Sequence, residues 1–468
     1  MDMNRRNILQ CGAGLLAWLA ALRTSARAQS HQAGHEPVEK PGGQPSITPM
    51  PKGGFVSVKT PDIPKLPYEL QDGVKVFNLV AEPMKRDFLP GKKAFDVWGY
   101  NGSMPGPTIE VMEGDRVKIV FHNKLPEPTT VHWHGLEVPI TMDGVPAISQ
   151  PLVYPGEMYT YEFTLHQNGT FFYHSHLPMQ EMMGMIGLFI IHPREPYKPP
   201  VDKDFGLILQ EWAILPNNTI PNTLSMEFNW LTMNGKAGPA TTPLIVKLGD
   251  RVRIRFVNLG MDHHPMHLHG NQFYVTGTEG GRVPESLWYP QNTVLVGVAQ
   301  ARNIEFEAKY PGDWMLHCHL PHHMMNQMIS MVGPMAHVGS GMHTGMGMEE
   351  GMGMMRQGPA LSEEHGPGMG RGMGMTQREK ATSSMVGMNM GQMHEHKGPM
   401  TMTGAKEERK RVPGFPQDMW MPMDEAVVKP ETYGLAKDWS GAVVGMMTLV
   451  RVLPPDMYEK VRSLMWEP

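Results

Sequence analysis

Residues 317–328 read His-Cys-His-Leu-Pro-His-His-Met-Met-Asn-Gln-Met, and Cys318 is one of only 2 cysteines in the 468-residue chain. Successive side chains of a β-strand point to opposite faces, so Cys318 can serve one metal site while His317 and His319 reach another behind it. Two histidines, one cysteine and a weakly bound methionine are the ligands of a blue-copper electron-transfer site. The ligands that this pattern predicts here are His264, Cys318, His323 and Met328.

Three further pairs of histidines each enclose a single residue, so a strand would deliver both rings of a pair to one face. One such pair alone is more often a surface or core feature than a metal site. Four pairs, one of them around a cysteine, favour a cluster of copper ions, because imidazole binds copper well. The eight predicted ligands are His132, His134, His174, His176, His267, His269, His317 and His319.

The sequence also repeats internally. The run Gly-Asp-Arg-Val at 114–117 returns at 249–252, and His-Trp-His-Gly at 132–135 returns at the same offset as His-Leu-His-Gly at 267–270. Each copy has short, alternating β-branched runs separated by Gly and Pro, which is typical of β-sandwiches. A copy is about 130 residues long, enough for one hydrophobic core. The chain is therefore predicted to be all-β, with two sandwich domains.

The four histidine motifs, HWHG, HSH, HPMHLHG and HCHLPHHMMNQM, resemble the copper motifs of multicopper oxidases over residues 75–335. The resemblance implies two cupredoxin-like Greek-key domains and four coppers per functional unit, one type 1, one type 2 and two type 3. It implies that type 1 copper is bound by His264, Cys318, His323 and Met328, and type 2 copper by His132 and His267. The type 3 ligands that it implies are His134, His174, His176, His269, His317 and His319.

Asp143, in Met142-Asp143-Gly144, matches the family's acid beside the cluster, and a carboxylate suits a proton relay to O2. The alternative is a turn residue before Gly144. Three-domain members often carry a second carboxylate just after the last type 1 histidine, where this chain has Met324.

Only about 90 residues separate His176 from the ligands of the second copy, too few for a further domain. The chain thus resembles two-domain multicopper oxidases, in which the cluster lies between the first domain of one subunit and the second domain of its neighbour. A heterologous contact of this kind must close into a ring, so a homotrimer is expected.

In the first copy the positions of His264, Cys318 and His323 hold Thr129, Ser175 and Gln180, while Met185 corresponds to Met328. Neutral oxygen ligands cannot replace a thiolate for a redox-active copper, so the first domain is expected to hold no type 1 copper.

The N-terminus indicates export. Asn4-Arg5-Arg6, an apolar run from 11 to 22 and Ala26-Arg27-Ala28 resemble a twin-arginine signal, which predicts a periplasmic protein. The run is too short to cross a membrane, so no membrane anchor is expected. The net charge of -5 argues against nucleic acid as a partner. The predicted segments are a signal peptide at 1–28, a loose arm at 29–66, domain 1 at 67–197, domain 2 at 198–335, an insertion at 336–403 and a segment returning to domain 2 at 404–468.

The insertion is rich in Met, Gly and His, and its composition predicts a flexible segment. Thioether sulfur favours Cu(I), so this segment could gather cuprous ions. The alternative is a plain linker. Beyond it, Gly445-Met446 echoes Gly184-Met185, which predicts that residues 440–453 complete the sheet of domain 2. Met446 is then a rival to Met328 as the axial ligand.

These features together predict a periplasmic oxidase that couples one-electron oxidation of Cu(I), for copper tolerance, or of small aromatic donors to four-electron reduction of O2 to water. One alternative is a laccase that acts mainly on phenols. Another is a copper nitrite reductase, although that family keeps its blue copper in the first domain. The third is a periplasmic copper-binding protein without enzymatic activity. Fold and copper motifs alone do not distinguish donors.

Overall fold

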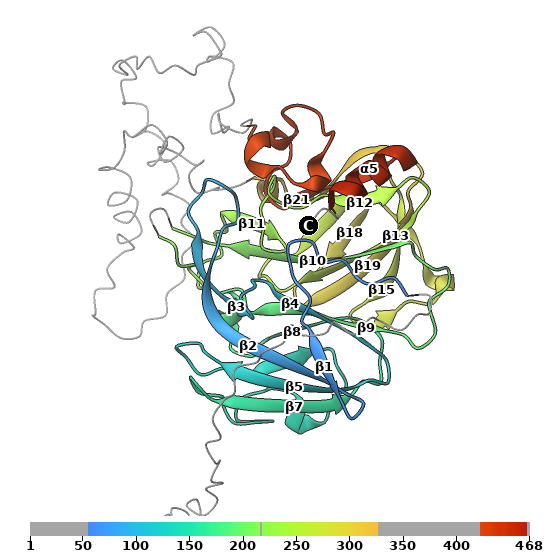
Figure 1. Cartoon of the computed structure of the whole chain (residues 1–468). Coiled ribbons are helices and arrows are strands. Elements are labelled where there is room, and N and C mark those ends of the chain that lie inside the picture. The colour runs from blue at the N-terminus through green and yellow to red at the C-terminus, as the bar shows by residue number, and fades with distance from the viewer. Residues whose placement is uncertain (1–54, 216–217, 326–421, 466–468) are drawn as a thin grey trace, which may run out of the picture. The chain divides into compact units, whose positions relative to one another are not determined.

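The computed structural model describes residues 55–215, 218–325 and 422–465 (Figure 1). The predicted signal peptide, the insertion at 336–403 and Met328 lie outside the described residues.

The first copy forms a β-sandwich. One sheet has the order β1-β2-β5-β7 with β3 beside β2, and the other has the order β4-β9-β8-β6. Large apolar side chains such as Phe77, Phe121 and Trp133 fill the space between them. The strands are β1 (Tyr68–Gln71), β2 (Val74–Arg86), β3 (Phe95–Tyr100), β4 (Gly106–Met112), β5 (Arg116–Asn123), β6 (Val131–His134), β7 (Met158–Thr164), β8 (Gly169–Ser175) and β9 (Ile186–His192).

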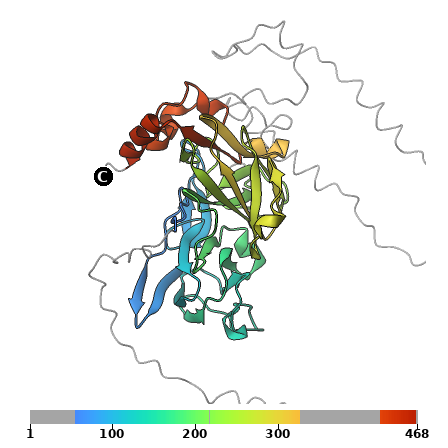
Figure 2. The ribbon, with the colours of Figure 1, turned by 90° about the vertical axis from the view of Figure 1, so that its right-hand side faces the viewer.

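The second copy forms another sandwich, above the first in Figure 2. One sheet has the order β11-β10-β13-β19-β15-β16 with β17 beside β15, and the other has the order β12-β21-β20-β14-β18. The strands are β10 (Lys203–Trp212), β11 (Trp230–Met233), β12 (Leu244–Lys247), β13 (Arg251–Asn258), β14 (His264–Leu268), β15 (Phe273–Thr278), β16 (Gly281–Arg282), β17 (Pro290–Gln291), β18 (Thr293–Val296), β19 (Gln300–Glu307), β20 (Gly312–Cys318) and β21 (Met447–Leu453). The all-β architecture with two cupredoxin-like sandwiches agrees with the prediction.

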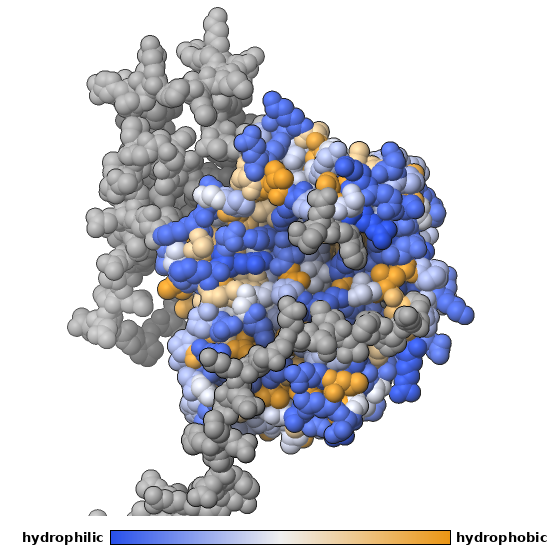
Figure 3. Space-filling view, in the orientation of Figure 1, coloured by the Kyte–Doolittle hydropathy of each residue, from blue (hydrophilic) through white to orange (hydrophobic). Residues whose placement is uncertain are grey.

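In the residues that the structure describes, helices are few, and all except α5 are short. Those described are η1 (Ile140–Met142), α2 (Pro178–Glu181), η2 (Glu285–Leu287), η3 (Pro321–Met324), η6 (Asp424–Val427), η7 (Pro430–Thr432), η8 (Trp439–Gly441) and α5 (Pro455–Met465). In the described part of the chain, no helix is both long and apolar enough to cross a membrane. The face seen in Figure 3 is mostly hydrophilic, with scattered apolar patches.

The segment after residue 421 belongs to the second sandwich. Strand β21 is antiparallel to β20 and parallel to β12, and it places Met447 opposite His317. Helix α5 then buries Val461 against Ile245 and Leu453. The strand expected within residues 440–453 thus lies beside the Cys318 strand.

Residues 55–66, which fall within the predicted loose arm, contact both sandwiches. Val58 and Ile63 are buried in an apolar cluster that contains residues of both sandwiches, among them Phe172 of β8 and Ile208 of β10. Lys59 also pairs with Phe205 in a parallel bridge. The Pro- and Gly-rich composition of the predicted arm gave no sign that these apolar side chains are buried. In the structure, residues 55–66 pack against both sandwiches.

A polar contact crosses the same seam near the histidine motifs. Nη1 of the buried Arg255 donates to Oγ1 of Thr170 on β8 at 2.7 Å, and Thr170 donates to Oδ1 of Asn303 at 2.9 Å. Asp204 accepts two hydrogen bonds from Arg255 at 2.8 Å, so the buried guanidinium is neutralised. The two sandwiches are therefore joined by apolar and by paired polar groups.

Candidate metal centres

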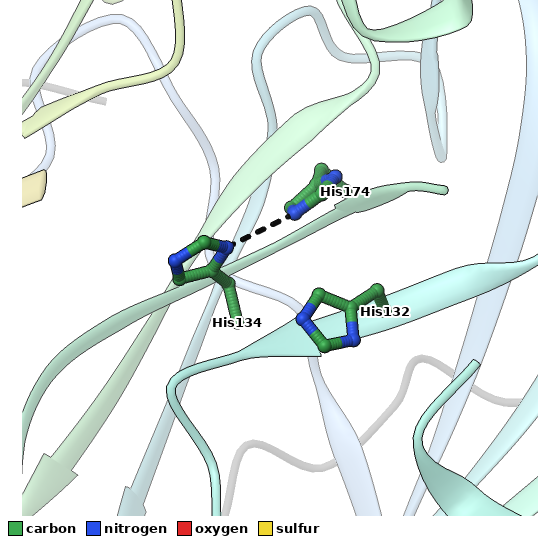
Figure 4. A group of neighbouring side chains, drawn as sticks. All are labelled: His132, His134 and His174. Carbon is green, nitrogen blue, oxygen red and sulfur yellow. Dashed lines mark hydrogen bonds between the residues drawn. The ribbon is translucent and has the colours of Figure 1, made fainter. Parts of the chain in front are cut away.

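The first histidine group (His132, His134, His174 and His176) lies where β6 pairs with β8. His132 stands directly opposite His174 in the antiparallel register. Nδ1 of His134 lies 3.3 Å from Nε2 of His174, as Figure 4 shows. One ring nitrogen from each of His132, His134 and His174 lies within 4.8 Å of the others. His176 is close by, with its ring centre 5.3 Å from that of His132.

The second histidine group (His267, His269, His317 and His319) lies where β14 pairs with β20. His267 stands opposite His317. The ring centre of His267 lies 4.9 Å from that of His269 and 5.5 Å from that of His319. Nε2 of His269 is 3.0 Å from Nε2 of His317. In each group, therefore, ring nitrogens of two neighbouring histidines lie within 3.3 Å of each other.

The two histidine groups make no ring contact with each other, although the structure describes all eight residues. Every ring contact between these histidines falls within one group, five contacts in the first and five in the second. Each sandwich of one chain thus offers half of the predicted cluster.

Backbone carbonyls fix the orientation of the rings. Nδ1 of His132 lies 2.7 Å from the carbonyl oxygen of Asp143, and Nδ1 of His267 lies 2.8 Å from that of Asn292. A ring that donates from one nitrogen has the other free as a metal ligand. For these two rings the free atom is Nε2.

Burial favours the neutral, metal-binding form of the imidazoles. Burial, together with the charges of the neighbouring histidines, lowers the pKa of His134 to about 4. Burial likewise lowers the pKa of His317 and of His269. Neutral rings do not have to lose a proton before they bind a metal.

The thiol site (His264, Cys318 and His323) lies behind the second histidine group, in the core of the second sandwich. Sγ of Cys318 is 3.7 Å from Nδ1 of His264 and 3.5 Å from Nδ1 of His323. The two Nδ1 atoms are 3.2 Å apart. Burial and the charge of His264 lower the pKa of His323 to about 3. A buried triangle of two imidazoles and a thiol fits a copper ion.

Met446 contacts the thiol site through its backbone. Its backbone N–H donates to the carbonyl of His323 at 2.9 Å, and its carbonyl accepts from the N–H of Cys318 at 3.0 Å. The side chain is fully buried and packs in the same apolar cluster as Cys318. Gly445 permits this close passage: its φ is +65°, and a Cβ there would lie 2.4 Å from the carbonyl oxygen of His323.

The first sandwich corrects the alignment of Met185 with Met328. The N–H of Ser175 donates to the carbonyl of Met185 at 3.2 Å, which is the bond that Cys318 makes to Met446. Met185 therefore corresponds in space to Met446. The sequence spacing misled because the residues between His323 and Met446 far outnumber those between Gln180 and Met185.

The first sandwich has no thiol at the matching position. Oγ1 of Thr129 lies 3.1 Å from Oγ of Ser175, which in turn donates to Oε1 of Gln180 at 2.8 Å. Hydroxyl and amide groups thus satisfy each other where the second sandwich holds imidazoles and sulfur.

Asp143 reaches His132 in two ways. Its carbonyl makes the hydrogen bond described above, and its Oδ1 lies 3.5 Å from Nδ1 of His132. Gly144, at φ +87°, is required because a Cβ would lie 1.9 Å from the carbonyl oxygen of Val131. Asp143 therefore ends a tight turn and also places a carboxylate beside the first histidine group.

Sequence reasoning missed four polar residues around the sites. Oε1 of Glu181 lies 3.0 Å from Nδ1 of His174, and Oε2 of Glu211 lies 3.1 Å from Nε2 of His264. Asp262 and the exposed His322 gather with His323 within 4.8 Å. No motif marks Glu211, which comes from a strand distant in sequence. His322 and Asp262 could have been noted, because they adjoin the motifs.

Two cupredoxin-like sandwiches that present eight histidines and a buried thiol define a copper protein of the cupredoxin type. Two family models described as multicopper oxidase match residues 84–196 and 214–333. The crystal structure of a blue copper oxidase from Nitrosomonas europaea is 32% identical, with a TM-score of 0.50, and the match covers 54% of this chain and 81% of that one. The chain belongs to the multicopper oxidase family.

Curated relatives match only in part. Copper resistance protein A of Escherichia coli is 37% identical over 134 residues, 29% of this chain and 22% of the relative. L-ascorbate oxidase of Cucurbita pepo var. melopepo is 43% identical over 121 residues, 25% of this chain and 22% of the relative. The chain thus spans about a fifth of the length of these relatives.

Proposed function

We propose that the protein is a periplasmic, copper-dependent oxidase that takes single electrons from Cu(I), or more slowly from small aromatic donors, and reduces O2 to water. One observation carries the proposal: the buried thiol of Cys318 belongs to the thiol site, while its chain neighbours His317 and His319 belong to the second histidine group. A single tripeptide therefore connects a one-electron site to a multinuclear one.

The residues present fit four coppers in number and chemistry. In this proposal type 1 copper is bound by His264, Cys318, His323 and Met446, and type 2 copper by His132 and His267. The type 3 ligands are His134, His174, His176, His269, His317 and His319. Bound copper would supply the one-electron oxidation of the donor and the four-electron reduction of O2.

The chain's own residues prepare this chemistry. Burial around Cys318 excludes water from the thiol site, and the backbone between residues 317 and 319 gives a short covalent path from sulfur to two imidazoles. Asp143 holds a carboxylate at His132, where it can pass protons toward the reduced oxygen. Four electrons and four protons are consumed for each O2 that becomes two waters.

Separation of the two histidine groups supports an inter-subunit cluster. Apolar side chains near each group are exposed in the single chain. Ile140 and Ile148 flank Asp143, and Leu287 and Leu295 flank Asn292, whose carbonyl orients His267. Exposed apolar residues around an incomplete site are typical of a surface that a second copy covers. A ring of three subunits would complete three clusters.

Met446 rather than Met328 is proposed as the methionine that would bind the copper of the thiol site. The axial ligand tunes the potential of a blue-copper site. Met446→Leu is therefore expected to raise the reduction potential of the blue centre and to change its electron paramagnetic resonance spectrum. Met328→Leu, the matched control, is expected to leave both unchanged. A redox titration of the two variants checks this, and the reverse result would restore Met328.

Nitrite reduction is a second candidate because of one relative. A probable nitrite reductase-hydroxylamine oxidoreductase fusion protein of Kuenenia stuttgartiensis is 29% identical over 278 residues, 56% of this chain and 31% of the relative. The contacts of Thr129, Ser175 and Gln180 argue against it, since a blue copper in the first domain would require a thiolate there.

Oxygen uptake with Cu(I), a phenol and nitrite in parallel tests the function. We expect rapid uptake with Cu(I), slower uptake with the phenol and no consumption of nitrite. Nitrite reduction without oxygen uptake, or copper binding without turnover of any donor, would contradict the oxidase.

The same assay on a variant without residues 336–403 separates a cuprous oxidase from a laccase. The deletion removes none of the proposed ligands. If the methionines of this segment capture Cu(I), the KM for Cu(I) is expected to rise while kcat is unaltered. Turnover of the phenol serves as the internal control and is expected to stay constant or rise. Equal Cu(I) kinetics would mean that the segment is a linker.

A further inference from the structure

The two sandwiches allow the surroundings of the thiol site to be compared with those of a copy that lacks the thiol. Asn258 and Asn123 end equivalent strands, β13 and β5, and hold the loops that follow. Nδ2 of Asn258 donates to the carbonyl of Asp262 at 2.8 Å, and Nδ2 of Asn123 donates to that of Glu127 at 2.8 Å. In each loop the N–H two residues after the Asn donates to its Oδ1 at 2.9 Å. Asp262 and Glu127 are therefore counterparts.

The carboxylate of Asp262 belongs to this shared framework. Its Oδ2 lies 3.3 Å from Nε2 of His323. In the first sandwich Nε2 of Gln180, at the position of His323, donates to Oε2 of Glu127, also at 3.3 Å. Both sandwiches thus carry a carboxylate at this position, although only the second has the thiol. The carboxylate of Asp262 is therefore not specific to the copper site.

Glu211 has no such counterpart. It lies on β10, two residues after the residue that pairs with Asn258. On the equivalent strand β2 of the first sandwich, Pro83 occupies the position two residues after the partner of Asn123. The first sandwich holds its loop with the same asparagine contacts and without this carboxylate. Glu211 is therefore specific to the copy that contains the thiol site.

The side chain of Glu211 is completely buried beside an equally buried His264, and its Oε2 lies 3.1 Å from Nε2 of that ring. Its Oε1 accepts hydrogen bonds from the backbone N–H groups of Asp262, at 2.9 Å, and of Met261. Among the described residues, no Lys or Arg forms an ion pair with it. Three N–H donors converge on the carboxylate, an arrangement suited to its ionised form.

We propose that Glu211 is a positioning residue that lowers the reduction potential of the copper at the thiol site, an inference that rests on the proposed function. By accepting the proton of Nε2 it fixes His264 with Nδ1 toward Cys318. Its negative charge stabilises the more positive, oxidised metal, and burial leaves this interaction almost unscreened by salt.

Redox titration of the copper-loaded protein, followed by its blue absorbance, tests this role with two matched variants. Glu211→Gln keeps the size of the side chain and removes the charge, and Asp262→Asn does the same at the framework carboxylate. We expect Glu211→Gln to keep the blue band and raise the potential. The equilibrium constant with a one-electron mediator is expected to change at least tenfold, which corresponds to 59 mV. Asp262→Asn is expected to change this constant by less than threefold.

An unaltered potential in a blue Glu211→Gln variant would overturn the proposal and leave the oxidase function intact. An equal rise in Asp262→Asn would also overturn it, because any nearby charge would then suffice. If Glu211→Gln does not fold, Glu211→Asp replaces it in the test. This variant withdraws the carboxylate by one methylene and should raise the reduction potential by a smaller amount. An unchanged potential would refute the positioning role of Glu211. A wild-type protein without a blue band would instead overturn the proposed function, and this inference with it.

Discussion

Replacement of Cys318 by Ser is expected to abolish the blue absorbance of the copper-loaded protein and to reduce oxygen uptake at least about a thousandfold, because a hydroxyl cannot replace a thiolate for a redox-active copper. Cys318 is the free thiol of the described residues, and it is buried between His264 and His323. Copper at the two histidine groups should remain, since no cluster ligand is changed. Absorption spectroscopy and copper analysis measure both effects.

Ser175→Ala provides the matched control, because Ser175 occupies the same register position in the first sandwich. It should remove the hydrogen bonds of the hydroxyl to Thr129, Gln180 and the backbone N–H of Leu177, and keep both colour and oxygen uptake. Blue absorbance retained in Cys318→Ser would show that the thiol is not a copper ligand. Lost absorbance in both variants would point to a general effect on folding.

The sequence predicted the local parts of the site well and its long-range parts less well. Alternation along a strand follows from backbone geometry, so the pairs around Trp133 and Leu268 could be placed on one face without a structure. The repeat likewise predicted that Thr129, Ser175 and Gln180 meet. Spacing along the chain is a poor guide to the choice between Met328 and Met446, because a long segment interrupts the loop after His323 and spacing in sequence then no longer reports spacing in the fold.

Carboxylates beyond the motifs could not be predicted for the same reason. Glu211 reaches His264 from β10, through the packing of strands that are far apart in sequence. The buried segment at 55–66 was missed because its few apolar residues, such as Val58 and Ile63, show no strand period and are buried only where the two sandwiches meet. Both cases depend on tertiary contacts rather than on local pattern.

Mixing two inactive variants is expected to restore oxygen uptake if the cluster lies between subunits. His134→Ala damages the first histidine group and leaves the second intact. His269→Ala does the reverse. Each variant alone should form only damaged clusters and be inactive. The two half-sites of one chain make no ring contact in the described structure, so an intact first group in one subunit can meet an intact second group in its neighbour.

The fraction of oxygen uptake that returns shows whether the cluster lies between subunits. In rings of three assembled from equal amounts of both variants, about one quarter of the contacts join an intact first group to an intact second group, so about one quarter of wild-type activity should return. The variants must be mixed unfolded or co-expressed so that subunits exchange. Co-assembly of wild type with either variant, followed by light scattering, verifies that mixed rings form. Mixed rings without activity would mean that each cluster is built within one chain. Every chain in the mixture carries one of the two substitutions, so every intrachain cluster would lack one histidine.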